Sequence, residues 1–373
     1  MKKVILNTPE QMLFDLLKAA LHQTKAEQAN FQSASDEDWK LCYRLAVRQG
    51  VMALAWDGVE TLPDSLQPSR NLKLSWALAV EAYEKKYAYY CRTVHELSAF
   101  YAEKGITTVQ LKGVGLSTLY PIPSHREGGD VDIYTFSADH RKLTDAEANS
   151  LADELMVEQG LEVEKHSYKH SNFFYKGIPI ENHKFFLNVQ HYPIARPINE
   201  WLKNNLHPEA TVLSDGKCHV LTPSVAFNTM FLAFHASQHF GSGIALHHLC
   251  DWAVLINRFG VQYPSELIDK RFEEAIAAFT HLCNCYLGTQ VSITGGEELA
   301  EEVLQEILHP KFPHKEAISV KGKLNIFIYK TRRFLHGAKV SNRILYIPFW
   351  KRVWMSIVAH LRRPETFFQT APK

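Results

Sequence analysis

Apolar residues recur every three or four positions through most of the first hundred residues of the chain. This spacing places them on one side of a helix, and it predicts three helices, over residues 8–20, 36–49 and 72–101. We expect Thr8 to cap the first helix and Gly50 to end the second. The pattern therefore predicts an all-helical N-terminal unit over residues 1–104.

The hydrophobic pattern changes at Gly105, where β-branched and alternating runs replace the helical spacing. The predicted elements are strands at 106–109 and 131–136, a helix at 146–159 and a hairpin at 168–187. A glycine turn and a short helix over 115–120 separate the two strands, and Lys176-Gly177 is the expected hairpin turn. Residues 105–195 are therefore expected to form a mixed α/β core.

Helical spacing returns after Pro197 and continues through most of the remaining chain. The predicted helices cover residues 224–239, 247–258, 265–287 and 297–308. Residues 196–373 are thus expected to form a C-terminal helical unit. The whole chain is predicted to have an α+β fold, in which a small mixed-sheet core is flanked by two all-helical units.

The composition narrows the class of protein. Of the 373 residues, 46% are hydrophobic and 22% are charged, which fits a folded chain with large cores. The net charge of +1 provides no global field that favours nucleic acid or an acidic partner. No apolar stretch approaches the roughly 18 residues of a membrane span, and the start does not resemble a signal peptide. With six scattered cysteines, these features predict a cytoplasmic protein with reduced thiols.

Two aspartates mark the candidate active site, in the run Gly128-Gly129-Asp130-Val131-Asp132. Alternate residues of a strand share a face, so Asp130 and Asp132 point together while Val131 enters an apolar layer. Paired carboxylates repel each other unless a cation lies between them, and such oxygen ligands suit Mg²⁺ or Mn²⁺. The pair therefore predicts a divalent metal site.

A third carboxylate is expected from the second arm of the hairpin, where Glu181 and His183 share a face. If that arm pairs beside the strand of Asp130 and Asp132, Glu181 becomes the third metal ligand. His183 is a candidate of lower rank at the same place.

The residues before the acid pair favour phosphate binding. Gly113 lies in a turn with Lys112 before it and Ser117 after it, so that backbone N–H groups, an ammonium and a hydroxyl are available to phosphate oxygens. Arg126 lies between this turn and the acid pair and suits a bidentate phosphate contact. A structural ion pair with Asp130 or Glu127 is the alternative for this arginine.

The order of glycine turn, acid pair and later acid resembles the DNA polymerase beta superfamily of nucleotidyltransferases. A narrower likeness, to the uncharacterised bacterial nucleotidyltransferase family often labelled NTP_transf_5, covers most of residues 30–260. The motifs that carry it are Leu111-Lys112-Gly113, Leu119-Tyr120-Pro121, Arg126 and Asp130-Val131-Asp132-Ile133.

The resemblance implies a Mg²⁺-dependent transfer of a nucleoside monophosphate from an NTP to an acceptor, by in-line displacement at two metal ions. Asp130 and Asp132 would bind the metal ions. Glu181 would complete the second site or take the proton of the acceptor. The phosphate-binding residues named above would hold the NTP. The acceptor, whether a small molecule, a sugar, a protein or RNA, does not follow from the likeness.

Two other functions stay open at this point. The larger residue after Gly113, and Glu181 where relatives carry Asp, also fit an inactive descendant that binds a nucleotide or a partner as a scaffold. His235 and His239 lie four residues apart on one predicted helix, with Asp251 beyond them, as in a His/Asp metal hydrolase. We favour the interpretation that both histidines pack between helices, bonded to backbone or to Asp251, and line a cleft beside the core.

The C-terminal part has its own charge pattern. Between Ala317 and Pro364 there are eleven Lys or Arg and no Asp or Glu, interleaved with aromatic residues. The helical spacing of Trp350, Val353 and Trp354 predicts a buried face, so we favour a packed helical unit with a solvated basic face. A wall that faces nucleic acid or triphosphate and a membrane-surface helix are the alternatives.

Overall fold

The computed structural model describes residues 4–213, 216–312 and 322–362. Its N-terminal part is helical, as predicted, with α1 (Thr8–His22), α2 (Asp36–Arg48), α3 (Met52–Glu60) and α4 (Arg70–Glu103). The expected cap of the first helix is wrong by one residue. Asn7 caps α1, because its side chain accepts a hydrogen bond from the backbone N–H of Glu10, whose carboxylate in turn binds the backbone N–H of Asn7.

The centre of the fold is one six-stranded mixed sheet in the order β3-β4-β2-β1-β6-β5. Its strands are β1 (Ile106–Gln110), β2 (Val131–Ser137), β3 (His170–Tyr175), β4 (Ile178–His183), β5 (Glu209–Leu213) and β6 (Cys218–Thr222). Strand β2 is antiparallel to β1 and parallel to β4. The predicted hairpin joins β3 and β4, and its turn residues Lys176 and Gly177 have φ angles of 50° and 76°. The predicted α+β fold class is confirmed.

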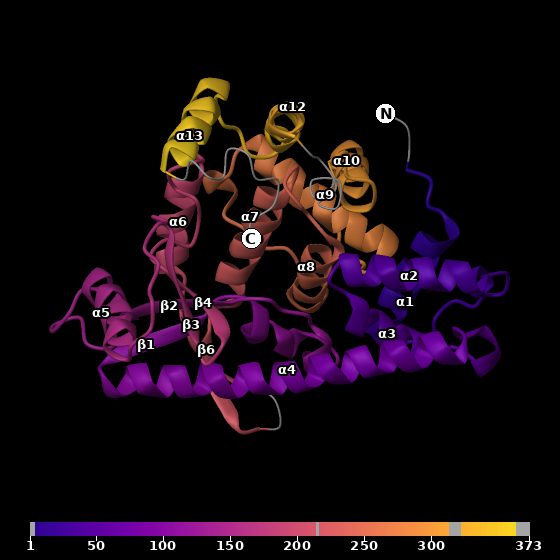
Figure 1. The fold of residues 1–373 in the computed structure, drawn as a ribbon, viewed down its shortest axis with the longest axis horizontal. Helices are drawn as coiled ribbons and strands as arrows, with labels where there is room; N and C mark the ends of the chain where they lie inside the picture. The colour runs from indigo at the N-terminus through magenta and orange to yellow at the C-terminus, as the bar shows by residue number, and fades with distance from the viewer. Residues whose placement is uncertain (1–3, 214–215, 313–321, 363–373) are drawn as a thin grey trace.

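Different helices cover the two faces of the sheet (Figure 1). Helices α4 and α5 (Asp145–Glu158) pack against one face, where Ile133 and Ile180 join the apolar residues of both helices in a buried cluster. Helix α7 (Val225–His239) lies over the opposite face, where Phe186 packs between Tyr134 of β2 and Phe227 of α7. The side chains of β2 and β4 therefore alternate between two differently covered faces.

Helix α4 links the N-terminal helices to the sheet and runs across the lower part of Figure 1. Near its start, the buried Trp76 donates its indole N–H to the carbonyl of Met52 at 2.9 Å, at the beginning of α3. Towards its end, Val94 and Tyr101 pack under the sheet. One continuous helix thus fixes the position of α3 relative to the strands.

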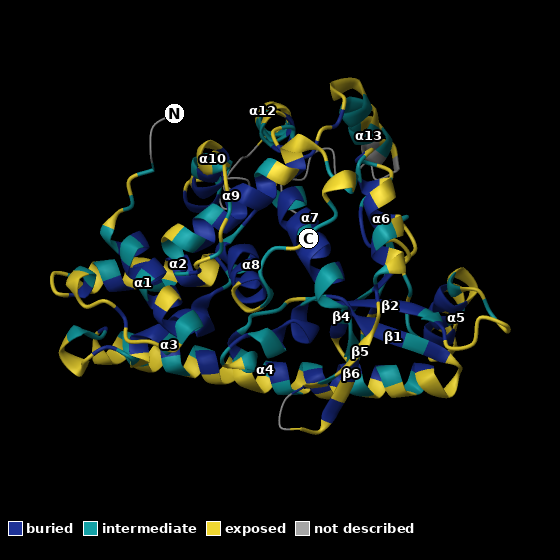
Figure 2. Cartoon of the chain, turned by 180° about the vertical axis from the view of Figure 1, so that it is seen from behind, coloured by how far each residue is buried: buried dark blue, intermediate teal, exposed yellow. Residues whose placement is uncertain are grey.

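The C-terminal part contains α6 (Ala195–Asn204), α7, α8 (Leu246–Phe259), α9 (Lys270–Tyr286) and α10 (Glu297–Leu308). Helices α7, α8 and α9 form the buried centre of Figure 2. Strands β5 and β6 were not predicted, because the chain was expected to be helical after residue 197. Both strands are short and β5 is mostly exposed, so the sequence gives them little hydrophobic alternation.

The described part of the basic segment forms α12 (Lys323–Ser341) and α13 (Phe349–Arg362), while residues 317–321 and 363–364 of that prediction lie outside the described residues. The predicted buried face of α13 is wrong, because Trp350 and Trp354 are 79% and 65% exposed. This helix contributes to the wall of a cavity instead of a tight core.

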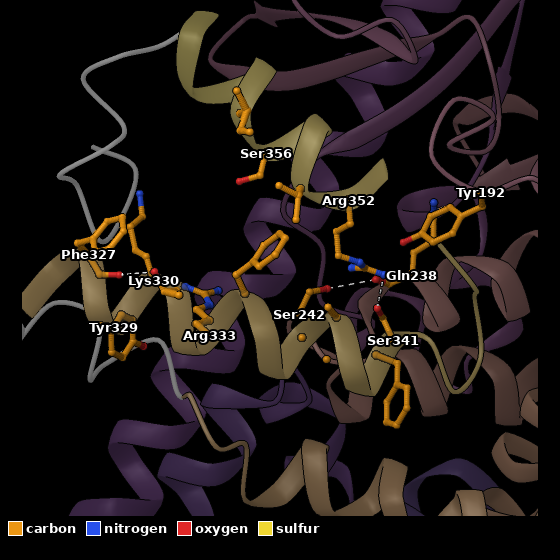
Figure 3. Close-up of a pocket in the computed structure, with 18 of the residues that line it drawn as sticks. Tyr192, Gln238, Ser242, Phe327, Tyr329, Lys330, Arg333, Ser341, Arg352 and Ser356 are labelled. Atoms are coloured by element: carbon orange, nitrogen blue, oxygen red, sulfur yellow. Dashed lines mark hydrogen bonds between the residues drawn. The ribbon is translucent and has the colours of Figure 1, made fainter. Parts of the chain in front are cut away.

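That cavity has a volume of about 1050 Å³ and lies where α12 and α13 meet the end of α7 (Figure 3). Apolar side chains such as Phe334 and Val353 line it, and Arg352 points across it to Ser341, with a hydrogen bond of 2.7 Å. None of the predicted acids or phosphate-binding residues is part of its lining. Among the described residues, no helix combines the length and the hydrophobicity that a membrane span needs.

Candidate functional site

Strands β2 and β4 bring Asp132, Glu181 and His183 together. Asp132 is paired with Glu181 across the two parallel strands, and His183 lies two residues further along on the same face. The Nε2 atom of His183 is 2.9 Å from Oδ1 of Asp132 and 3.5 Å from Oε2 of Glu181. Each of the three residues offers one ligand atom, and these three atoms lie within 4.8 Å of one another. We call these three residues the acidic site.

The hydrogen bonds of His183 fit a cation at the acidic site. Its Nδ1 is 3.2 Å from the carbonyl oxygen of Phe185, a distance at which Nδ1–H donates to the backbone. The Nε2 atom then turns its lone pair toward the carboxylates of Asp132 and Glu181, which is stable only when a proton or a metal ion lies between them. The two carboxylates are oxygen ligands of the kind that suit Mg²⁺ or Mn²⁺, whereas the imidazole of His183 is a ligand that transition metals prefer.

Lys112 provides a positive charge beside the acids. Its Nζ lies 3.1 Å from Oδ2 of Asp132, and the aspartate is almost fully buried. Burial raises the pKa of Asp132, but Lys112 and His183 outweigh burial and hold that pKa below its usual range. The pKa of Glu181 is also lowered, because His183 and His170 outweigh burial and the charge of Asp132. Both acids are therefore ionised at neutral pH.

Lys169 is a site residue that the sequence analysis missed. Burial lowers its pKa, and the nearby charge of Lys112 adds to that effect, while Asp132 and Glu181 oppose it. The residue directly precedes β3 in the sequence, and its backbone bonds to Lys184 just after β4. Nothing in the sequence distinguishes Lys169 from a surface lysine, because its place depends on the hairpin folding back over the acids.

Asp130 lies at the edge of the acidic site rather than within it. Strand β2 begins at Val131, and Asp130 is half-buried in the turn before it. Its charge still acts on Lys112 and Lys169, and together with burial it raises the pKa of Tyr90. The aspartate thus faces the same lysines as Asp132 but does not belong to the compact group of ligand atoms.

The predicted glycine turn is present, although its shape differs from the expectation. Gly113 has a φ of 63°, and a Cβ atom there would lie 3.6 Å from Nη1 of Arg126 and from the carbonyl oxygen of Asp130. The helix expected over 115–120 is replaced by two short 3-10 turns, Gly113–Gly115 and Ser117–Leu119, before the chain extends at Tyr120. Gly113 therefore keeps the backbone close to both Arg126 and Asp130.

Ser117 points away from the acids. Its hydroxyl is fully buried, donates to the carbonyl of Val114 and lies 2.9 Å from the hydroxyl of Tyr87 on α4. The structure therefore brings Lys112, Gly113 and the acidic site together and places the Ser117 side chain on the α4 side of the turn.

Arg126 forms a buried ion pair with Asp251 of α8. Its Nε and Nη2 atoms lie 3.1 Å and 2.7 Å from the two carboxylate oxygens, and Tyr120 donates its hydroxyl to the same carboxylate at 2.6 Å. Burial opposes ionisation of Asp251, but Arg126 and Tyr120 hold its pKa below the usual range. The expected partners Asp130 and Glu127 are therefore not the ones that bind this arginine.

The loop between the glycine turn and β2 is anchored to the N-terminal helices. Glu127 accepts a hydrogen bond of 2.9 Å from the backbone N–H of Ala53, at the start of α3. His125 lies 2.6 Å from Asp57 and 3.1 Å from Glu84. Such contacts fix the path of the loop, and hence the start of β2, from outside the sheet.

The candidate histidines of α7 gather with a third histidine from α8. His235, His239 and His248 each offer one ligand atom, and these atoms lie within 4.8 Å of one another. We call them the histidine cluster. Neither His235 nor His239 bonds to Asp251, which Arg126 and Tyr120 occupy. Lys112 and Lys169 help to lower the pKa of both histidines, so the cluster lies in the field of the same two lysines as the acidic site.

The site thus combines ionised carboxylates on paired strands, a candidate divalent metal site and adjacent lysines, which is the chemistry of enzymes that handle phosphate groups. Residues 35–288 match the family described as uncharacterised nucleotidyltransferase, and the protein belongs to this family. The match spans more than half of the chain and confirms the family that the motifs predict. No curated protein and no solved structure matches the chain.

Proposed function

We propose that the protein is a Mg²⁺-dependent or Mn²⁺-dependent nucleotidyltransferase that moves a nucleoside monophosphate from an NTP to an acceptor. The single observation that carries the proposal is the pairing of Asp132 with Glu181 on neighbouring strands of a chain from this family. Two ionised carboxylates beside Lys112 suit a metal-bound triphosphate.

In this proposal Asp132 and Glu181 hold the metal, and Asp130 adds a ligand from the edge of the site. Mg²⁺ supplies charge neutralisation of the triphosphate and activation of the acceptor oxygen when it is bound. The acceptor hydroxyl would give its proton to water, its oxygen would attack the α-phosphorus, the bond from the α-phosphorus to the bridging oxygen of the β-phosphate would break, and pyrophosphate would leave. The lowered pKa of Glu181 favours its role as a ligand over that of a general base.

The basic groups of the site would bind the phosphates. Lys112 lies 3.1 Å from Asp132, the charges of Asp132 and Glu181 act on Lys169, and Gly113 lets the backbone approach closely. The ion pair with Asp251 would hold the guanidinium of Arg126 in place next to the glycine turn. Ser117 is left out of this set, because its hydroxyl is bonded within the turn and to α4.

Thermal unfolding in the presence of each NTP, with and without Mg²⁺, tests the proposal. A ligand that binds only the folded state stabilises it by about 2.7 kcal/mol at a hundredfold excess over Kd. We expect a Mg²⁺-dependent rise in Tm for at least one NTP in the native protein and in Asp139→Asn, a control just beyond the other end of β2. Asp130→Asn/Asp132→Asn should lose the rise.

An unchanged Tm with every NTP, or an equal rise in Tm in the double variant, would contradict the proposed metal and nucleotide site. A rise in Tm without pyrophosphate release in the presence of candidate acceptors would instead support a nucleotide-binding protein that has lost catalysis.

A further inference from the structure

The histidine cluster is a second group of metal ligands, chemically unlike the acidic site. His235 and His239 lie one helical turn apart on α7, and His248 comes from the neighbouring α8. The ring centroids are 4.7 Å apart for His235 and His239, 5.3 Å for His235 and His248, and 4.7 Å for His239 and His248. Three imidazoles thus converge from two helices.

The hydrogen bonds around the cluster leave the imidazole nitrogens of His235 and His239 available. Within the described part of the chain, neither of these two imidazoles has a hydrogen-bond or ion-pair partner, and it is the backbone carbonyl of His239 that accepts hydrogen bonds from Ser242 and Gly243. The Nδ1 atom of His248 accepts a hydrogen bond of 3.2 Å from the backbone N–H of Ala245 in one tautomer, and in the other Nδ1–H donates to the Ala245 carbonyl oxygen at 3.3 Å. Only the second tautomer leaves the Nε2 lone pair for a metal, so binding of a metal at Nε2 would select it. The adjacent His247 instead bonds to the carbonyl of Gln49 at 3.3 Å.

The cluster is in its uncharged form at neutral pH. Burial lowers the pKa of His239 to about 4, with a contribution from Lys112, and the pKa values of His235 and His248 lie well below the usual range for the same first reason. Neutral imidazole is the form that binds metal ions.

The charge of the surroundings does not exclude a dication. Lys112 and Lys169 are the cations whose fields reach His235 and His239. Lys112 is paired with Asp132 at 3.1 Å, and the charge of Asp132 also acts on Lys169. Part of the positive charge near the cluster is thus balanced where it originates, at the ion pair of Lys112 with Asp132.

We propose that His235, His239 and His248 form a zinc site, separate from the acidic site. Three nitrogen ligands suit a borderline-soft ion such as Zn²⁺, whereas Mg²⁺ prefers the oxygen ligands of Asp132 and Glu181. Three protein ligands leave a coordination position for water or for an oxygen or nitrogen atom of a substrate. The inference does not depend on the proposed transferase activity, since it rests on α7 and α8 alone.

Metal analysis of the full-length chain tests the site directly. Protein stripped with a chelator, incubated with ZnCl₂ and desalted is expected to retain one zinc per chain, and calorimetric titration with Zn²⁺ gives the affinity. His235→Ala and His239→Ala should weaken binding by more than the about 10–100-fold that changes outside the ligand shell cost. Co²⁺ in place of Zn²⁺ should give the visible absorption of a low-coordinate nitrogen site in the native chain only.

Two controls separate this site from other sources of zinc. His281→Ala removes an imidazole that lies 3.4 Å from the exposed thiol of Cys285, a second pair of zinc-binding side chains, and should retain full binding. Asp132→Asn/Glu181→Gln should also retain it. His239→Gln, which keeps a polar side chain of similar length, guards against loss through unfolding, which circular dichroism monitors.

The proposal is overturned if the native chain retains no zinc, or if folded His235→Ala and His239→Gln retain it. The proposal would also be overturned if zinc is lost in Asp132→Asn/Glu181→Gln or in His281→Ala but retained in the variants of the histidine cluster. Because the acidic-site variant is expected to keep zinc but lose the NTP-dependent rise in Tm, failure of this inference is distinguishable from failure of the proposed function.

Discussion

The two faces of β2 and β4 bury polar groups in opposite ways. On the face toward α5, Asn182 of β4 bonds to Thr135, Asn149 and Asp153, each at 2.9 Å, and the surrounding strand residues are apolar. The residues before and after Asn182, Glu181 and His183, point to the face toward α7. There they lie beside Asp132, which is paired with Lys112.

This difference shows how the pleat of a strand separates folding from chemistry. The α5 face joins mostly uncharged polar groups in one hydrogen-bonded network, which defines the register of the strands, although among the described residues Oδ1 of Asn149 and Oδ2 of Asp153 have no hydrogen-bond partner. The α7 face collects charges whose partners are a lysine, a histidine and, in our proposal, a metal ion. We therefore expect substitutions on one face to reduce activity and on the other to reduce stability.

The largest expected effect concerns Asp132 on the α7 face. Asp132→Asn removes a charge that Lys112 and the proposed metal share, so nucleotidyl transfer should fall by at least about 100-fold, the usual range for one preorganised electrostatic contact being 10²–10³. Pyrophosphate release from NTP in the presence of Mg²⁺ measures it. Unchanged turnover in the folded variant would contradict the assignment of the chemistry to the α7 face.

Ile133 is the next residue of β2 and points to the opposite face. Ile133→Ala should lower the free energy of unfolding by about 2–5 kcal/mol, because it opens a cavity in a fully buried cluster. Chemical denaturation measures the loss. Mg²⁺-dependent NTP affinity of the folded fraction should stay as in the native chain, and a selective loss of that affinity would show that the faces are not independent.

Asn182 tests the polar part of the structural face. Asn182→Ala leaves Thr135, Asn149 and Asp153 without a shared partner, so we expect a loss of about 1–3 kcal/mol in unfolding free energy. The exposed Phe174→Ala on the same hairpin, with 66% of the side chain exposed, is the control and should change it little. Equal effects of the two substitutions would contradict the network.

His125 gives the smallest expected effect, and it lies outside both faces. Burial lowers its pKa, but the carboxylates of Asp57 and Glu84 outweigh burial and raise it above 6.5. The histidine therefore stabilises the folded state fully below its unfolded pKa, and this contribution is lost as pH rises through the folded pKa. The slope is at most about 1.4 kcal/mol per pH unit.

Urea denaturation from pH 6 to 9 checks this prediction. His125→Gln should flatten the fall in unfolding free energy above pH 6.5, whereas Asp132→Asn should leave the fall in place. An identical pH profile in His125→Gln and the native chain would show that the loop anchor does not titrate as described.

Local sequence patterns were sufficient to predict many of the helices and strands. The helix expected over 36–49 and the turn at Lys176-Gly177 depend only on neighbouring residues, and both form as predicted, the helix starting from a capping box of Ser35 and Asp38. Strand alternation likewise placed Asp132 on the face opposite Val131, but the expectation that Asp130 shares the strand with it is wrong, because β2 begins at Val131 and Asp130 lies in the turn before it. Strands β5 and β6 escaped prediction because their pairing comes from contacts with β1 and with each other rather than from their own pattern.

The missed parts of the site depend on distant packing. Lys169 reaches the acids only through the fold of the hairpin, and His248 meets His235 only because α8 packs on α7. The pairing of Arg126 with Asp251 joins residues 125 positions apart, and no local rule connects them. Sequence spacing thus identified individual candidate residues, while tertiary packing decided which of them meet.

The most direct test of the central claim is a crystal structure with Mn²⁺ and a non-hydrolysable NTP, with anomalous diffraction recorded at the manganese edge. Our account predicts manganese against the carboxylates of Asp132 and Glu181, with the triphosphate beside Lys112. Manganese and nucleotide bound elsewhere, with the acidic site closed by Lys112 alone, would contradict it.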